Sequence, residues 1–61
     1  MPLVNVKVYE QRVTPEFSAK VIERITDVIC ELTSEEMRQY TWVLVEGVPP
    51  SQWGMSGQPG G

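Results

Sequence analysis

A chain of 61 residues, 41% of them hydrophobic, is long enough for one small domain. Its net charge of −3 and its five scattered Lys and Arg residues argue against the basic surface that nucleic-acid binding requires. A single cysteine and the lack of histidine exclude an internal disulfide and the usual zinc-ligand spacings, so self-association is the support left for so small a core.

The start of the chain, residues 1–9, is predicted to be a β-strand. Valines alternate with other side chains over this stretch, and a period of two is typical of a strand. An initiator methionine is readily removed before a small residue, so we expect Met1 to be cleaved and Pro2 to begin the mature chain as a secondary amine.

Such an amine is well suited to proton transfer. Its reference pKa is about 7.7–8.0, and burial or a neighbouring guanidinium lowers it further because each disfavours the cation. In a chain without histidine, Pro2 is therefore the best candidate for a general base. The plainer alternative is that Pro2 merely begins an edge strand.

Residues 10–13 form a polar connection, and a helix is predicted to follow. Thr14, Pro15 and Glu16 supply a hydroxyl N-cap, a proline at the first helical position and a carboxylate in the first turn. We expect the helix to run to about Leu32, with Cys30 as an inert thiol. Apolar residues at steps of three and four predict one buried face, made of Phe17, Val21, Ile22, Ile25, Val28, Ile29 and Leu32.

After the helix, Thr33 and Glu36 match a capping box, which predicts a single further helical turn. Residues 40–46 are rich in aromatic and β-branched side chains and predict a second strand. Strand, helix and strand make a β-α-β unit with two parallel strands and a right-handed crossover. One helix covers only one face of such a sheet, so the other face must meet another subunit.

The end of the chain is turn-rich. Residues 47–52 contain two prolines and connect to residues 53–57, where glycines predict a small hairpin or tight turn. We therefore predict an α+β domain over residues 1–57 with a short C-terminal hairpin, and a flexible tail over residues 58–61.

Three further residues are candidates for a site. Arg12 follows the first strand at the end opposite Pro2, so the two can share a site only where strands of two subunits pair in antiparallel fashion. A guanidinium there could bind a carboxylate and steady a developing enolate, although a solvated loop arginine is the ordinary interpretation. Trp53 either packs against a neighbour or forms an apolar lid. Arg38 lies near the start of the second strand, where a surface role is the simpler one.

Together these features resemble the 4-oxalocrotonate tautomerase family across nearly the whole chain. The resemblance is carried by Met1-Pro2 before a strand, Arg12 ten residues after Pro2, the capped amphipathic helix, Val45-Glu46 at the end of the second strand, and the segment 53–57. It implies a tautomerase-like homo-oligomer, a hexamer built as a trimer of dimers, that acts without a metal or an organic cofactor.

The resemblance also implies an activity. Pro2 would serve as general base and then acid in moving a proton on a small 2-hydroxydienoate or 2-keto acid, such as 2-hydroxymuconate. Arg12 of a neighbouring subunit would bind a substrate carboxylate, and Trp53 would keep the pocket dry.

The sequence departs from the family pattern at one cation. The family's second arginine falls at Thr41 here, and Arg38, three residues earlier, could bind substrate in its place if the preceding turn presents it. Alternatively, a different chain in a mixed hexamer supplies it. Retention of Met1 would turn the Pro2 nitrogen into an amide and abolish its basicity.

Other functions stay open on the same scaffold. One is a dehalogenase, hydratase or decarboxylase, in which Glu46 or Glu10 activates water. Another is a non-catalytic partner subunit. No apolar run approaches about 18 residues and no charged start precedes an apolar block, so we expect neither a membrane span nor a secretory signal. A lone thiol suits a reducing cytoplasm.

Overall fold

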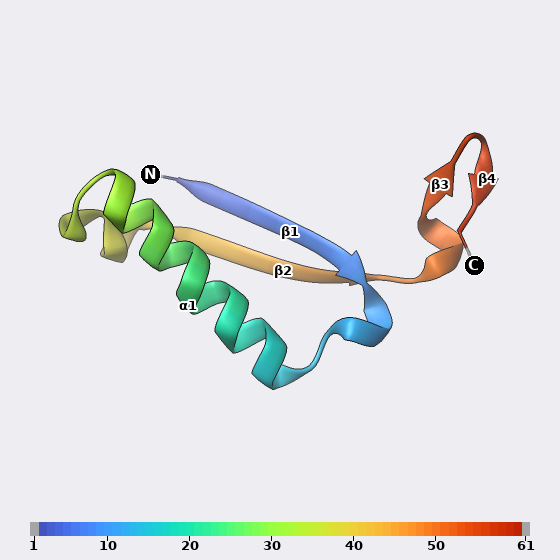
Figure 1. The fold of residues 1–61 in the computed structure, drawn as a ribbon, viewed down its shortest axis with the longest axis horizontal. Helices are drawn as coiled ribbons and strands as arrows, with labels where there is room; N and C mark the ends of the chain where they lie inside the picture. Colours follow the sequence, from blue (N-terminus) through green and yellow to red (C-terminus); the bar gives the residue numbers. More distant parts are fainter. Residues whose placement is uncertain (1, 61) are drawn as a thin grey trace.

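The computed structural model describes residues 2–60 and confirms the predicted β-α-β unit with a C-terminal hairpin (Figure 1). The strands and the helix are β1 (Leu3–Tyr9), α1 (Pro15–Leu32), β2 (Trp42–Val48), β3 (Gly54–Met55) and β4 (Gln58–Pro59). Short 3-10 helices connect them, namely η1 (Glu10–Arg12), η2 (Glu35–Tyr40) and η3 (Pro50–Gln52). β1 and β2 are parallel, and β3 and β4 are antiparallel.

The β1–β2 sheet has one face toward α1 and one face open. Leu3 lies opposite Trp42 in the parallel register, and side chains alternate between the two faces along each strand. Val6 contributes to a hollow shared with helix side chains, so the even-numbered residues of β1 lie on the helix side. The other face carries Leu3, Trp42 and Leu44, which are 64%, 58% and 47% exposed. The same face also carries the ion pair of Lys7 and Glu46, so only its part at Leu3, Trp42 and Leu44 is apolar. This open face is the one predicted to need a partner.

Helix α1 begins at Pro15 and ends at Leu32, as predicted, but the residue that follows it has a different role from the one predicted. Thr14 is its N-cap, and the Thr14 hydroxyl accepts a hydrogen bond from the Phe17 N–H at 3.0 Å. The capping box predicted at Thr33 is wrong, because the Thr33 hydroxyl donates to the Ile29 carbonyl at 2.6 Å and closes α1 instead. Ser34 precedes η2 without a side-chain cap. The segment that follows is a six-residue 3-10 helix rather than the single helical turn predicted.

The single apolar face predicted for α1 is wrong in part. Two strands are too narrow to cover so wide a stripe, and Val28 and Leu32 are 49% and 78% exposed. Other members of the stripe line an open hollow of about 520 Å³ between α1 and β1. Its lining residues are Val6, Phe17, Lys20, Val21, Arg24 and Ile25. Among residues 2–60 only Cys30, at 6% exposure, is fully buried.

The segments after α1 are displaced toward the C-terminus relative to the prediction. β2 begins at Trp42 rather than residue 40, because η2 continues to Tyr40, and the Thr41 hydroxyl then donates to the Met37 carbonyl at 2.7 Å. The flexible tail predicted from residue 58 is also corrected. Gln58 pairs with Met55 across a turn with positive φ at residues 56 and 57, and the Gly60 N–H donates to the Trp53 carbonyl. The rest of the predicted tail, Gly61, lies outside the described residues, as does the predicted removal of Met1.

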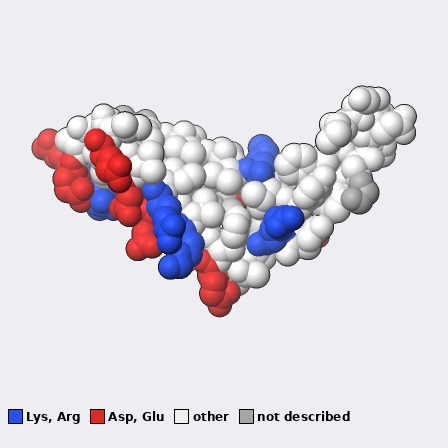
Figure 2. Space-filling view, in the orientation of Figure 1, with Lys and Arg blue, Asp and Glu red and all other residues white. Residues whose placement is uncertain are grey.

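The unit is thin and open for its size. Its extents are 43 × 24 × 14 Å, and its radius of gyration is 14.2 Å, against about 10.5 Å for a compact chain of this length. Its accessible surface is 4768 Å², against about 4,000 Å² for a compact monomer of this mass. Figure 1 shows the hairpin projecting from the sheet, and Figure 2 shows charge gathered along α1 with none over the hairpin on that face. Within residues 2–60, no helix has the length and apolar character needed to cross a membrane.

Candidate active site

Pro2 is held at the N-terminal edge of the sheet. Its carbonyl accepts a hydrogen bond from the Trp42 N–H at 3.0 Å, immediately before the strands begin to pair. Pro2 is half-buried. The hydrogen bond extends the parallel ladder by one step, so the pyrrolidine ring has a fixed place beside the start of β2.

Arg12 and Trp53 lie at the opposite edge. Arg12 is exposed at the end of η1, which follows β1 directly. The Trp53 ring lies 4.9 Å from the Tyr9 ring between centroids, at an interplanar angle of 49°. The Trp53 indole N–H donates to the Val48 carbonyl at 3.1 Å. Tyr9 and Val48 are partners in the register, so Trp53 folds back onto the C-terminal end of the sheet.

Gly47 allows η1 to approach β2 at this edge. A Cβ atom at Gly47 would lie 3.0 Å from the Val13 Cγ2 atom and 3.1 Å from the Glu10 Cα atom. Both distances are shorter than ordinary van der Waals contact, so a side chain at this position would displace η1 or β2. The missing side chain therefore helps to place the helix that carries Arg12.

These positions divide the candidate residues between two ends of the chain. The length of β1, about 20 Å, separates Pro2 from Arg12 and Trp53 within one chain, as predicted. One chain thus does not bring its own Pro2 and Arg12 together. A site that contains both needs the C-terminal edge of another chain's sheet beside Pro2.

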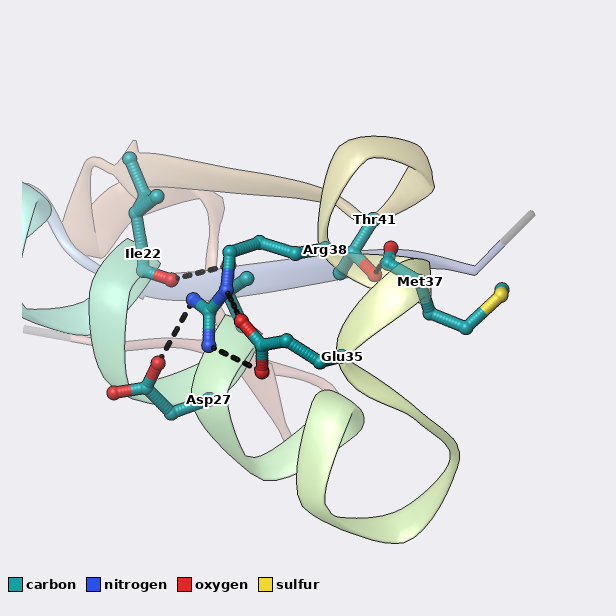
Figure 3. Close-up of polar contacts among 7 residues, drawn as sticks. Ile22, Asp27, Glu35, Met37, Arg38 and Thr41 are labelled. Carbon is teal, nitrogen blue, oxygen red and sulfur yellow. Dashed lines mark hydrogen bonds and ion pairs between the residues drawn. The ribbon is translucent and has the colours of Figure 1, made fainter.

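Arg38 lies in η2, just before β2, and its side chain extends to α1 (Figure 3). Its Nε and Nη2 atoms donate to the two carboxylate oxygens of Glu35 at 2.6 and 3.3 Å. Its Nη1 atom donates to Asp27 Oδ1 at 2.9 Å. The hydrogen bond from Arg38 lowers the pKa of Glu35 below its ordinary value of 4.5. The bonds to Glu35 and Asp27 raise the pKa of the Arg38 guanidinium.

This cluster was missed from the sequence, although one of its two contacts follows from residue spacing. Glu35 and Arg38 stand at i,i+3, a spacing that brings side chains together on a helix. Asp27 comes from α1, and its contact with Arg38 depends on how η2 packs against that helix. The Tyr9–Trp53 contact likewise depends on the chain folding back after β2.

The remaining candidates for chemistry are acidic side chains. Glu46, considered for water activation, accepts a hydrogen bond from the Lys7 ammonium at 2.6 Å on the open face of the sheet. Glu10 is exposed in η1. In the part of the chain that the structure describes, no group of three or more His, Cys, Asp or Glu side chains is placed to hold a metal ion.

By its fold the chain is a β-α-β protein, with a parallel two-stranded sheet, one helix on one face of the sheet and a small terminal hairpin. A family model described as tautomerase enzyme matches residues 2–60. The chain therefore belongs to the tautomerase enzyme family, which confirms the predicted family at that level. No curated protein and no solved structure matches the chain.

Proposed function

We propose that this protein is a cofactor-independent tautomerase that moves a proton on a small 2-hydroxydienoate or 2-keto acid. Membership of the tautomerase family over residues 2–60 supports this activity. The observation that carries it is the position of Pro2, fixed at the start of β1 by the hydrogen bond from Trp42. The chain has no histidine that could act as the base in its place.

In the proposed reaction the Pro2 amine acts twice. Its lone pair first removes a proton from the enol hydroxyl of the substrate, or from a carbon beside the keto group of a 2-keto acid, and the electrons left behind are delocalised as an enolate or dienolate. The resulting ammonium then delivers the proton to another atom of the conjugated system, a carbon in ketonisation, which regenerates the free amine. Base and acid are thus one group, whose pKa must lie near the working pH to serve in both directions.

Arg12 and Trp53 complete the proposed site from a neighbouring subunit. The Arg12 guanidinium binds the substrate carboxylate in bidentate fashion and stabilises negative charge on the enolate oxygen. Trp53 covers the apolar part of the substrate and excludes water. A drier pocket lowers the pKa of the Pro2 amine, because burial disfavours its charged form.

The assembly that we propose is a homo-hexamer, a trimer of dimers. The exposed apolar face at Leu3, Trp42 and Leu44 supports association, and so does the surface that exceeds that of a compact monomer. A mixed hexamer would need a second chain, and purification of this chain alone distinguishes the two. Native mass spectrometry should then give six copies, whereas a monomer would contradict the proposal.

The direct test of the activity is Pro2→Ala. Protein shown by intact mass to begin at Pro2 should ketonise 2-hydroxymuconate or phenylenolpyruvate, followed by ultraviolet absorbance. Pro2→Ala replaces the fixed ring nitrogen with a freely rotating primary amine, so it should lower kcat by at least about 100-fold, the contribution of a correctly positioned general base. Glu23→Gln, an exposed change on α1, is the control and should leave the rate unchanged. Equal rates in Pro2→Ala and the parent protein would reject Pro2 as the base.

A further inference from the structure

We infer that this site selects substrates with a single carboxylate, because Arg38 is held by Asp27 and Glu35 and does not bind a second one. The inference rests on the proposed function and narrows its substrate class. It assigns Arg38 to the packing of η2 against α1 rather than to substrate.

Arg38 forms a cluster with Glu35 and Asp27. Three N–H donors of the guanidinium point to carboxylate oxygens at 2.6, 2.9 and 3.3 Å. Figure 3 shows the side chain directed from η2 toward Asp27 on α1. The group thus links two elements, and a substrate carboxylate would have to compete with two intramolecular partners.

The cluster of Arg38, Asp27 and Glu35 has a net negative charge. One positive charge on Arg38 faces two negative charges, on Asp27 and Glu35. A second substrate carboxylate would approach a group with a net negative charge. If Arg38 turned toward that carboxylate, Asp27 and Glu35 would be left unpaired beside it. Like charges close together are unfavourable, so a turn of Arg38 toward the substrate would not remove the repulsion from Asp27 and Glu35.

The other positively charged side chains are Lys7, Arg12, Lys20 and Arg24. The chain has five Lys and Arg residues, and all lie within residues 2–60. Lys7 is paired with Glu46 on the open sheet face. Lys20 and Arg24 line the hollow between α1 and β1. Arg12 remains, at the edge that a neighbour would bring to Pro2. The shared site therefore offers one guanidinium for one carboxylate.

The substrate class follows from this charge distribution. One end of the molecule carries the carboxylate and the enol or keto group, which Arg12 binds. The rest is uncharged and lies against Trp53, as an aryl or alkenyl group would. A 2-hydroxy-2,4-dienoate with one carboxylate and an arylenolpyruvate both fit this description, whereas 2-hydroxymuconate carries a second carboxylate.

The experiment uses two matched pairs of ligands with the intact, processed oligomer. Turnover of phenylenolpyruvate is compared with turnover of 2-hydroxymuconate. Binding of sorbate is compared with binding of muconate, which has the same carbon chain with a carboxylate in place of the methyl group, by tryptophan fluorescence. We expect kcat/KM and affinity to favour the monocarboxylates by about tenfold or more.

Arg38→Met then separates the two roles of Arg38. If Arg38 holds η2 to α1, both substrates should be affected alike, and the ratio of their kcat/KM values should stay within about twofold. A selective loss for 2-hydroxymuconate and muconate of tenfold or more would overturn the inference. Should Arg38→Met fail to assemble, tenfold preference of the parent protein for muconate over sorbate would overturn it equally.

Different results would reject the tautomerase activity and the single-carboxylate site. Absence of turnover with both substrates, in protein that begins at Pro2, would reject the tautomerase activity. Turnover of both with a preference for the dicarboxylate would leave the activity intact and reject only the single-carboxylate site.

Discussion

At the scale of single residues, Arg38 and Glu35 illustrate how an exposed ion pair couples stability to pH. The hydrogen bond from Arg38 depresses the pKa of Glu35 in the folded protein. A depressed carboxyl pKa contributes stability that is present above the unfolded pKa and is lost as the pH falls through the folded value. The side chains of Arg38 and Glu35 are 45% and 76% exposed, so salt should weaken the contribution.

We predict that Glu35→Gln lowers the thermal unfolding midpoint at pH 7 by a small amount that vanishes on acidification. The difference between parent and variant should shrink as the pH falls below 4.5, the ordinary carboxyl value. Midpoints should be measured at one protein concentration, because assembly also stabilises. Glu36→Gln, in the same 3-10 helix, is the control. A difference that stays constant from pH 7 to pH 3 would show that Glu35 acts without its charge.

At the scale of the elements, Gly47 determines how η1 sits against β2. We predict that Gly47→Ala destabilises the fold by about 1–3 kcal/mol, because overpacking against backbone and a branched side chain forces a shift. The Cβ atom would meet the Glu10 backbone at 3.1 Å. Displacement of η1 should also move Arg12 and raise KM more than it lowers kcat.

Gly54→Ala is the matched control for this prediction, since a Cβ atom there would meet nothing within 4 Å. Denaturant unfolding and steady-state kinetics of both variants provide the comparison. Equal stability of the two variants would show that the approach of η1 to β2 tolerates a methyl group.

The elements also show what the sequence could and could not predict. The strand period of the valines and the N-cap at Thr14 depend on neighbouring residues alone, and both predictions hold. The capping-box pattern predicts Thr33 as the start of the following helix, but the Thr33 hydroxyl donates to the Ile29 carbonyl behind it. Which side chains of α1 face the sheet depends on the width of the sheet. Leu32 therefore matches the periodic pattern and is nevertheless exposed.

The positions of the candidate site residues in the fold were predictable to the same degree. Placement of Pro2 and Arg12 at opposite ends follows from the length of one strand, and the structure agrees. The partners of Arg38 required the packing of η2 on α1, which no spacing within the sequence gives.

At the scale of the whole molecule, the chain is an incomplete unit. It is 14 Å thick along its shortest axis, it has one fully buried side chain among residues 2–60, and it carries exposed apolar side chains on the open face of the sheet. The same incompleteness extends to the site, because Pro2 and Arg12 lie at opposite ends of β1. Folding, assembly and the proposed catalysis are therefore expected to depend on the same subunit contacts.

Complementation between Pro2→Ala and Arg12→Ala tests whether the active site is shared between subunits. Each variant alone should be inactive toward phenylenolpyruvate. Unfolded together and reassembled at equal amounts, they should recover about a quarter of the parent activity, since random mixing pairs an intact Pro2 with a neighbour's intact Arg12 at that frequency. Reassembled oligomers of the correct mass with no recovery would contradict a site shared between subunits.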